Sequence, residues 1–276
     1  MPEGHTLFRL AADLRESFKG DQVAVSSPQG RFASSAALVD GSTVLDAQSY
    51  GKHLFVELSA GLAIHVHLGL YGVFTIATGV PPQPIGQVRL RLVGPRAYAD
   101  LRGATACDLV DERQQQALVD RLGPDPLRPD ADWERMWRAM SRSRRPVAAL
   151  LMDQGVVAGI GNVYRAELLY RAGLDPQVPG NRLSRRTVKA LWDESVDLMQ
   201  HGVRVGRIDT LAPVHDPAAA VDPDSGVAEG RYVYRRHGEG CRVCGTLVRT
   251  AELEGRNLYW CPRCQRRRTA RTRSAE

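Results

Sequence analysis

The 276-residue chain has few aromatic residues, 6% of the total, and no long apolar run. No stretch approaches the roughly 20 apolar residues of a membrane-spanning helix. The N-terminal segment MPEGHTLFRLAADLRESFKG contains no apolar stretch long enough for a signal peptide. We therefore expect a protein without membrane contact that works in the cytoplasm, where thiols stay reduced.

The rest of the composition is that of a globular protein. Hydrophobic residues make up 43% of the chain and charged residues 25%, and no internal repeat is visible. A chain of this length can build cores for about two domains. The formal net charge is +6 and the sequence pI is about 9.3. This basic excess favours a polyanionic partner such as nucleic acid, although many basic proteins bind none.

The N-terminal half combines one helix with many short strands. Apolar residues recur at helical spacing from Leu7 to Phe18, which predicts a helix over residues 3–18. Alternating or β-branched runs separated by Gly and Pro follow, and they predict a β-sandwich. These runs are QVAVSS, STVLDAQ, HLFVELS, LAIHVHL, GVFTIAT, QVRLRLV and RAYAD. Cys107 stands alone in a further strand-like run, ATACDLV, and we interpret it as a small buried residue.

The second half is helical. Residues 123–132, GPDPLRPDAD, are rich in Pro and Asp and predict a linker. The next stretch, WERMWRAMSRS, predicts one helix. Pro146 suits the first turn of another helix that runs through VAALLMDQ.

Two further helices and a loop are expected after the segment GVVAGIG. Asn162 is placed as the N-cap of a helix that ends near Gly173. Ser184 is placed as the N-cap of a last helix, which Gly202 closes. Residues 203–230 show little periodicity and predict a long loop, of a kind that is usually functional or disordered.

Four of the five cysteines form two C-x-x-C pairs near the C-terminus, with sixteen residues between the pairs. Each pair aims two thiolates at one ion, and four thiolates complete the closed tetrahedral shell of a structural zinc site. The predicted ligands of one Zn²⁺ are Cys241, Cys244, Cys261 and Cys264. The segment between the pairs alternates and turns near Glu254-Gly255, which predicts a β-hairpin with Arg256 at or near its tip. An arginine there suits contact with phosphate, but is also an ordinary surface residue.

Two other features carry possible chemistry. Gly159 and Gly161 allow a sharp double turn between two helices, and the amide of Asn162 at such a bend can hold a phosphate. At the N-terminus, removal of Met1 leaves Pro2 with a secondary amine whose pKa of about 8 makes it partly nucleophilic near pH 7. Glu3 can then serve as general acid and base, although an acidic residue in a first helical turn is also normal.

These patterns together predict an α+β fold: an N-terminal β-sandwich with an N-terminal helix, then a helical domain with a helix-two-turn-helix and a C-terminal β-hairpin zinc finger. The predicted parts are a catalytic domain 1–122, a linker 123–132, a helical domain 133–235, a zinc hairpin 236–268 and a basic tail 269–276.

Several motifs occur in a fixed order along nearly the whole chain. They are MPEG, GKHLF, HLGLYG, LLMDQGVVAGIGNVYRAELLYRAG and CRVCGTLVRTAELEGRNLYWCPRCQ. Together they resemble the formamidopyrimidine-DNA glycosylase and endonuclease VIII family. The start MPEGHT resembles the endonuclease VIII branch, especially its actinobacterial members.

The resemblance implies a bifunctional DNA glycosylase and AP lyase of base excision repair that acts on damaged double-stranded DNA as a monomer. Pro2 would be the Schiff-base nucleophile and Glu3 the proton donor, Lys52 would bind a phosphate and support elimination, and Arg256 would clamp a phosphate and assist δ-elimination. The implied DNA contacts are Leu70 and Tyr71 as a wedge, Asn162 on a phosphate and Arg102 near the opposite base.

The chain departs from the family pattern at two places. Gly69 stands where endonuclease VIII proteins often carry a glutamine, and the segment from Asp100 to Gly103 only partly matches a motif of the formamidopyrimidine branch. The resemblance favours oxidised pyrimidines as substrates, with oxidised purines as the alternative. Two other classes stay open: a non-catalytic zinc protein that binds DNA, and a metal-dependent nuclease using His65 and His67, which share one face of a strand.

Overall fold

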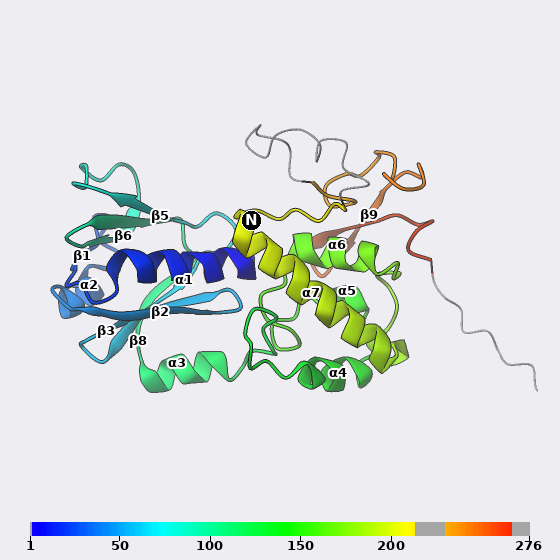
Figure 1. Cartoon of the computed structure of the whole chain (residues 1–276), viewed down its shortest axis with the longest axis horizontal. Coiled ribbons are helices and arrows are strands. Elements are labelled where there is room, and N and C mark those ends of the chain that lie inside the picture. Colours follow the sequence, from blue (N-terminus) through cyan, green and yellow to red (C-terminus); the bar gives the residue numbers. More distant parts are fainter. Residues whose placement is uncertain (1, 213–229, 267–276) are drawn as a thin grey trace, which may run out of the picture. The chain divides into compact units, whose positions relative to one another are not determined.

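The computed structural model describes residues 2–212 and 230–266 (Figure 1). The chain forms two compact units, residues 1–129 and 130–276. The predicted basic tail 269–276 and the part 213–229 of the predicted loop lie outside the described residues. Among the described residues, no helix combines the length and the apolar composition needed to cross a bilayer.

Unit 1 contains two four-stranded antiparallel sheets, with strand orders β1-β6-β7-β5 and β2-β3-β4-β8. Every predicted strand-like run holds one strand. The bounds are β1 Ala24–Ser26, β2 Val44–Tyr50, β3 His53–Leu58, β4 Leu62–His67, β5 Val73–Thr78, β6 Val88–Val93, β7 Ala97–Arg102 and β8 Ala106–Asp111. Buried side chains from both sheets form one core, which includes Cys107 as predicted.

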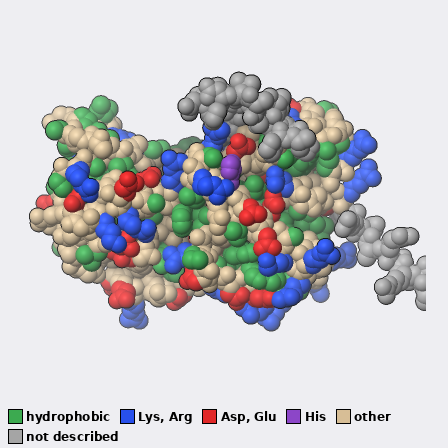
Figure 2. All heavy atoms as spheres, in the orientation of Figure 1, with side chains coloured by type: hydrophobic (Ala, Val, Ile, Leu, Met, Phe, Trp, Pro, Cys, Tyr) green, Lys and Arg blue, Asp and Glu red, His purple; other side chains and the backbone are tan. Residues whose placement is uncertain are grey.

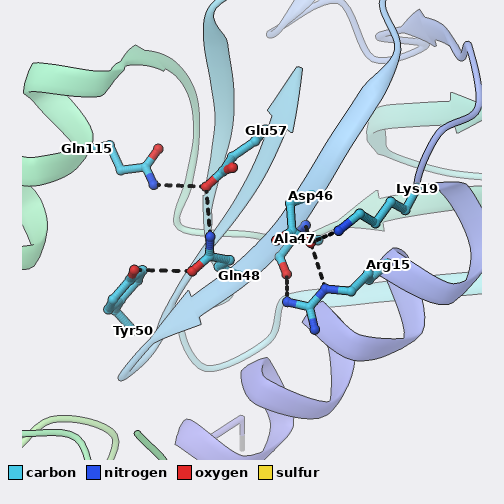
Figure 3. A network of polar contacts seen from close by, with 8 residues as sticks. All are labelled: Arg15, Lys19, Asp46, Ala47, Gln48, Tyr50, Glu57 and Gln115. Carbon is cyan, nitrogen blue, oxygen red and sulfur yellow. Dashed lines mark hydrogen bonds and ion pairs between the residues drawn. The ribbon is translucent and has the colours of Figure 1, made fainter. Parts of the chain in front are cut away.

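Helix α1, Gly4–Phe18, packs its apolar face into this core, as its periodicity predicts. Polar contacts fix its C-terminal half to β2 (Figure 3). Arg15 donates to the Asp46 carboxylate and to the Ala47 carbonyl, both at 2.6 Å. Burial works to raise the pKa of Asp46, but the Arg15 hydrogen bond, its own backbone contact and the charges of Arg15 and Lys19 hold it below its usual value.

Two helices of unit 1 were absent from the sequence expectation. Helix α2, Ala33–Val39, has seven residues and too few turns to show periodicity. Helix α3, Glu112–Val119, buries none of its residues fully and so lacks an apolar stripe. The sequence did hold a signal for its start, since Asp111 and Gln114 are spaced as in a capping box. In the structure they bond reciprocally, at 2.7 and 3.0 Å.

Unit 2 holds the remaining helices and the C-terminal hairpin. Their bounds are α4 Trp133–Ser141, α5 Val147–Leu150, α6 Asn162–Arg171, η1 Gly180–Arg182, α7 Arg185–Val205, β9 Arg249–Leu253 and β10 Arg256–Trp260. The α+β fold class and the predicted hairpin are confirmed.

Three helix boundaries differ from the expectation. Pro146 is the N-cap of α5 rather than its first helical residue, and α5 ends after one turn. Asn162 is the first residue of α6, and Gly161 occupies the N-cap in an extended conformation. Helix α7 starts at the Ser184 cap as predicted but runs past Gly202, which is buried in it. It ends where Gly206 takes a left-handed φ of 75°.

Candidate functional site

The direction of α1 relative to β2 brings the N-terminus to one end of unit 1. Gly20 N–H donates to the Val44 carbonyl at 2.8 Å, and Arg15 reaches the Ala47 carbonyl, so α1 runs antiparallel to β2. From Arg15 to its start the helix spans about 17 Å, and the strand from Ala47 to Lys52 spans about the same length. The N-terminal end of α1 and the turn that carries Lys52 therefore lie at the same end of unit 1.

Strand register adds the other predicted residues of unit 1 to this end. His53, at the start of β3, pairs with His67 at the end of β4, so the turn 68–72 lies beside the Lys52 turn. Val73 at the start of β5 pairs with Arg102 at the end of β7. The backbone thus gathers the predicted catalytic and wedge residues of unit 1 at one end, and we call this the sheet-end site. Its members are Pro2, Glu3, Lys52, Leu70, Tyr71 and Arg102.

Glu3 is the N-cap of α1 and is fully buried, while Pro2 is half-buried. The Glu3 carbonyl accepts the Thr6 N–H at 2.9 Å, and its own N–H donates to Thr6 Oγ1 at 3.4 Å. His5 beside it is also buried, and burial followed by the positive N-terminus lowers its pKa to about 4. The neutral imidazole adds no charge next to Glu3 near pH 7.

The Lys52 turn is fixed by the segment predicted as a linker. Asp125 is buried and accepts the N–H of Gly51 at 2.7 Å and that of Leu127 at 3.0 Å. The Arg128 guanidinium lies 4.4 Å from the centre of the Tyr50 ring, at the end of β2. Residues 124–128 therefore pack on unit 1 and hold the backbone that carries Lys52.

A third histidine joins the predicted pair His65 and His67, and sequence spacing alone did not reveal it. His53 Nδ1 lies 2.9 Å from His65 Nε2, and the two rings stack with centres 5.1 Å apart. His67 Nδ1 accepts the Gly69 N–H at 3.2 Å. Burial, followed by the neighbouring histidines and Lys52, lowers the pKa of His53 to about 4. These ring nitrogens are engaged with each other and with backbone, and within the described residues only the cysteines form a metal-binding group.

Leu70 and Tyr71 project from the tight turn between β4 and β5, with exposed fractions of 52% and 85%. Gly69 has a φ of +68°, and a Cβ atom there would lie 1.9 Å from Thr105 Oγ1. The missing glutamine therefore has a steric reason in this chain, because a side chain at 69 would force the Thr105 side chain to shift and would strain the left-handed backbone. The turn presents two large apolar side chains to solvent.

Arg102 is held in place by contacts within unit 1. It donates to Asp100 at 2.9 Å and to the Ile85 carbonyl at 3.2 Å. Asp100 is buried and also receives a bidentate pair from Arg91 at 2.7 and 2.8 Å. Hydrogen bonds from Arg91 hold the pKa of Asp100 below its usual value, against the effect of burial. The Arg102 guanidinium is thus ordered before any ligand binds.

The four C-terminal cysteines come together in unit 2, with all sulfur atoms within 4.8 Å of one another. Cys241 and Cys264 sulfurs are 3.9 Å apart, and those of Cys244 and Cys261 are 3.5 Å apart. Tetrahedral zinc with Zn–S bonds of about 2.3 Å requires sulfurs separated by about 3.8 Å. The cluster fits one structural Zn²⁺. Among the described residues the metal-binding group consists of these four cysteines, which fill the four positions of a tetrahedral shell.

Helix α6 contacts the four-cysteine cluster, which we call the zinc knuckle, through Tyr170. Its hydroxyl lies 3.1 Å from Cys241 Sγ and 3.9 Å from Cys264 Sγ, and its ring stacks on Tyr232. Burial, followed by the Cys241 contact, raises the pKa of Tyr170, so the hydroxyl stays protonated and donates to a thiolate. Gln265 completes the link, since its side chain accepts the Cys261 N–H at 2.8 Å and donates to the Leu174 carbonyl at 3.1 Å.

The other end of α6 holds the hairpin. Asn162 is buried, and its Nδ2 donates to the Asn257 carbonyl at 3.2 Å. Arg165, buried one turn later, donates to the same carbonyl at 2.9 Å and to the Asn162 side-chain oxygen. The double turn before α6 is closed by Gln154, which accepts the Gly159 N–H at 3.0 Å and donates to the Ile160 carbonyl at 3.0 Å.

Arg256 is exposed at the start of β10, directly after a two-residue turn. Both turn residues have positive φ, 49° at Glu254 and 72° at Gly255, which is the geometry of a tight hairpin. Arg145, upstream of the double turn, is paired with Asp153 at 2.7 Å and with Glu254 at 3.1 Å. It anchors the hairpin turn rather than offering a free cation.

Glu167, in the middle of α6, was not singled out from the sequence. Its buried carboxylate accepts the backbone N–H groups of residues 232–234 at 2.8–2.9 Å and the Thr210 hydroxyl at 2.6 Å. Tyr234 packs edge-on against Tyr259 of β10. Helix α6 therefore contacts the start of β10, residues 232–234 and the zinc ligands. We call these together the α6 hub.

Comparisons with known proteins cover both units. A model of the formamidopyrimidine-DNA glycosylase N-terminal domain matches residues 1–114, one of its H2TH domain matches 122–212, and one of the zinc finger found in FPG and IleRS matches 238–267. The proteins named Endonuclease 8 1 of Mycobacterium tuberculosis and Mycobacterium bovis are each 51% identical over 270 residues, 96% of this chain and 100% of theirs.

More distant relatives share the fold. The formamidopyrimidine-DNA glycosylase of Thermus thermophilus is 31% identical over 83% of this chain and 85% of its own. The crystal structure of the MutM (Fpg) protein from Thermus thermophilus has a TM-score of 0.76 at 28% identity, covering 96% of this chain and 98% of its own. Lactococcus lactis Fpg in complex with abasic-site DNA has a TM-score of 0.78 at 21% identity, covering 96% and 99%.

An N-terminal sandwich, a helix-two-turn-helix and a four-cysteine hairpin define a DNA glycosylase that carries AP lyase activity, the bifunctional class of base excision repair. The chain belongs to the formamidopyrimidine-DNA glycosylase and endonuclease VIII family.

Proposed function

We propose that this glycosylase and lyase removes oxidised pyrimidines from double-stranded DNA, with Pro2 as its nucleophile. The convergence of Pro2, Glu3 and Lys52 at the sheet-end site carries the assignment of the chemistry. The 51% identity to proteins named Endonuclease 8 1 supports the choice of lesion class. A single chain carries every residue involved, so we also propose a monomer, and a cytoplasmic location where the DNA substrate lies.

The proposed chemistry is covalent. The Pro2 nitrogen forms a bond to C1′ of the damaged nucleotide as the glycosidic bond breaks, and the base leaves with the electron pair and a proton. Glu3 protonates the ring oxygen when the sugar opens to an iminium. Loss of a C2′ proton then expels the 3′ phosphate, loss of the C4′ proton expels the 5′ phosphate, and water hydrolyses the iminium to release Pro2. No exchangeable metal takes part in these steps.

The remaining residues hold the DNA. Lys52 lies in a turn fixed by Asp125 and faces a phosphate beside the lesion. Leu70 and Tyr71 fill the gap left by the extruded base, whose unstacking costs a few kcal/mol. Arg256 grips a phosphate from the hairpin side and also assists δ-elimination. Asn162 contacts a phosphate once its buried amide exchanges its bonds to Asn257 and Arg165 for DNA. Arg102 meets the opposite strand.

Borohydride trapping tests the chemistry. Reduction of the iminium should yield a covalent adduct between the wild-type protein and DNA with a single damaged or abasic nucleotide, and mass spectrometry should place it on Pro2 after loss of Met1. Pro2→Gly should abolish the adduct. Glu3→Gln should slow base release about 10²- to 10⁴-fold with unchanged DNA affinity. Absence of any wild-type adduct would favour a non-catalytic DNA-binding protein, and cleavage lost in EDTA would favour a nuclease.

A panel of duplexes with one lesion each tests the substrate class. We expect dihydrouracil, 5-hydroxyuracil and thymine glycol to be excised faster than 8-oxoguanine opposite cytosine. The reverse order would replace this proposal with an oxidised-purine glycosylase.

A further inference from the structure

A depression of about 870 Å³ lies in unit 2, where the segment after α6, the first turns of α7 and the zinc knuckle meet. Its apolar lining includes Leu174, Val178 and Leu183. Its charged lining is entirely cationic, since no Asp or Glu is among the described residues that line it. The cations are Arg182, Arg186, Arg263 and Arg266. We call this site the basic depression.

The four arginines of the basic depression lack counter-charges, unlike their neighbours. Many Lys and Arg side chains lie next to Asp or Glu side chains on the face shown in Figure 2. Beside the depression, Arg185 pairs with Glu134, and Lys189 pairs with Asp193 at 2.6 Å. By contrast, the four lining arginines are exposed, and within residues 2–212 and 230–266 none forms an ion pair or a side-chain hydrogen bond. Such a cluster of unpaired cations favours a ligand with several negative charges.

Contacts between its walls hold the backbone around the basic depression. The Gln265 side chain donates to the Leu174 carbonyl at 3.1 Å and accepts the Cys261 N–H at 2.8 Å, which joins the zinc knuckle to the segment after α6. Ser184, the N-cap of α7, accepts the Thr187 N–H at 3.1 Å. The N-terminal end of this 21-residue helix adds partial positive charge to the wall. The arginines are therefore carried by an ordered backbone.

The residues of unit 2 that we propose to bind DNA lie at the other end of α6. Asn162 begins this helix, and its amide reaches the start of β10, where Arg256 lies. The ten residues of α6 span about 15 Å between that end and the basic depression. No residue proposed to contact DNA lines the depression. A ligand here therefore need not compete with the damaged duplex.

We propose that the basic depression binds an acidic segment of a partner protein, in which Asp and Glu side chains alternate with apolar ones. Carboxylates form bidentate pairs with guanidinium groups, and arginine clusters are a common means of recognising acidic motifs. Four separate guanidinium groups match several carboxylates along one chain better than they match one small anion. The apolar lining requires apolar side chains as well, which a free phosphate lacks.

The chain itself does not supply such a segment. The residues that follow Arg266, RRTARTRSAE, are themselves basic, so the arginines of the depression repel them. A second copy of the chain is also disfavoured, because each copy has a net charge of +6. The complementary charge must therefore come from another molecule. The proposal extends beyond the proposed function, on which only the placement of DNA rests.

The probe is a fluorescent peptide of about eight residues, in which Glu and Asp alternate with Leu, with an extended length of about 26 Å. One control peptide carries Ser in place of Leu, and another carries Lys in place of Glu and Asp. The protein variant is Arg182→Ala/Arg186→Ala. Its matched control, Arg185→Ala/Lys189→Ala, removes the same charge from neighbouring positions outside the depression. Zinc content and thermal unfolding show that each variant is folded.

Fluorescence anisotropy at about 0.15 M salt, where charges more than about 8 Å apart are screened, measures peptide affinity. We expect the affinity to fall about tenfold in the variant and to change less than about twofold in the control. The Ser peptide should bind more weakly than the Leu peptide, and the Lys peptide should not bind. Saturation of the wild type with an abasic-site duplex should leave peptide affinity unchanged.

Four results would each overturn the proposal: no binding of the acidic Leu peptide, equal affinity for the Ser peptide, equal losses in variant and control, or displacement of the peptide by the duplex. A variant that loses duplex affinity and keeps peptide affinity would assign the basic depression to DNA. A wild-type dimer that the variant abolishes would assign it to a second copy. Borohydride trapping without peptide tests the proposed function separately, so either proposal can fail alone.

Discussion

The two halves of the molecule position their functional residues by different means. At the sheet-end site the backbone does so: strand register and the direction of α1 bring turns together that are distant in sequence. In unit 2 the α6 hub does so, through side chains that reach the hairpin, residues 232–234 and the zinc ligands. Hence we expect the backbone of the sheet-end site to tolerate the loss of most single side chains, with Asp125 and Asp100 as exceptions, whereas unit 2 depends on a few side-chain contacts and one ion.

Zinc removal should show the largest difference between the halves. Structural zinc contributes roughly 10 kcal/mol or more in small zinc domains. Cys244→Ser should therefore abolish amide protection in β9 and β10, measured by hydrogen exchange, while β3 and β4 remain protected. Cys107→Ala, which alters a buried thiol of unit 1, is the control and should retain zinc. Amide protection of β9 and β10 in the metal-free protein would show that the contacts of the α6 hub hold the hairpin without zinc.

Glu167→Gln should give the next largest effect. The amide cannot accept every hydrogen bond now made to the buried carboxylate, so its neighbours lose partners. We expect a loss of about 2–4 kcal/mol in the free energy of unfolding, measured in urea. Glu194→Gln, which removes the charge from the partly exposed pair with Arg171, should cost less than about 1 kcal/mol. Similar losses of stability in both variants would contradict the claim that Glu167 holds unit 2 together.

Gly69→Ala tests how far the backbone alone shapes the sheet-end site. A left-handed φ costs a non-glycine residue about 1–2 kcal/mol, and the contact with Thr105 adds to this. The turn should shift and lesion excision should fall, while β3 and β4 keep their amide protection. Thr105→Gly in the same chain should restore part of the activity. Full activity in Gly69→Ala alone would show that the turn has room to move.

Acid should lower the stability of unit 1 gradually, and by less than the changes above. The pKa of His53 is about 4 in the folded protein and about 6.5 when exposed, so the folded state binds fewer protons. Its contribution to stability is complete above about pH 6.5 and is lost as the pH falls through 4. His53→Gln should therefore lose less stability than the wild type between pH 7.5 and 5, measured in urea. A steeper loss in the variant would reverse the sign of this argument.

Short-range patterns predicted much of the fold. Each strand of the sandwich was visible as an alternating run, and the periodicity of α1 was visible from Leu7 to Phe18. Helix α3 was not predicted, because none of its side chains is buried and it has no apolar stripe. Gly202 was wrongly predicted to end a helix, because a buried glycine inside a helix gives the same sequence signal. Spacing between cysteines predicted the zinc ligands directly.

Partners that are distant in sequence could not be predicted in the same way. Nothing near Lys52 indicates that Asp125 fixes its turn, since 74 residues separate Gly51 from that carboxylate. His53 joins His65 only through strand register, and Arg145 is taken up by Glu254 from the far end of the chain. The roles assigned to Pro2, Glu3 and Arg256 rest on family membership and geometry together, and they remain predictions until the variants are measured.

The contacts of α6 also limit how this protein can be rebuilt. Moving only the zinc hairpin of this chain, residues 238–267, into another protein would leave behind the groups that receive it: the Asn162 amide, the Arg165 guanidinium, the Tyr170 hydroxyl and the Leu174 carbonyl. A hairpin transferred in this way would therefore dock poorly. The smallest transferable module is the hairpin together with the helix on which it rests.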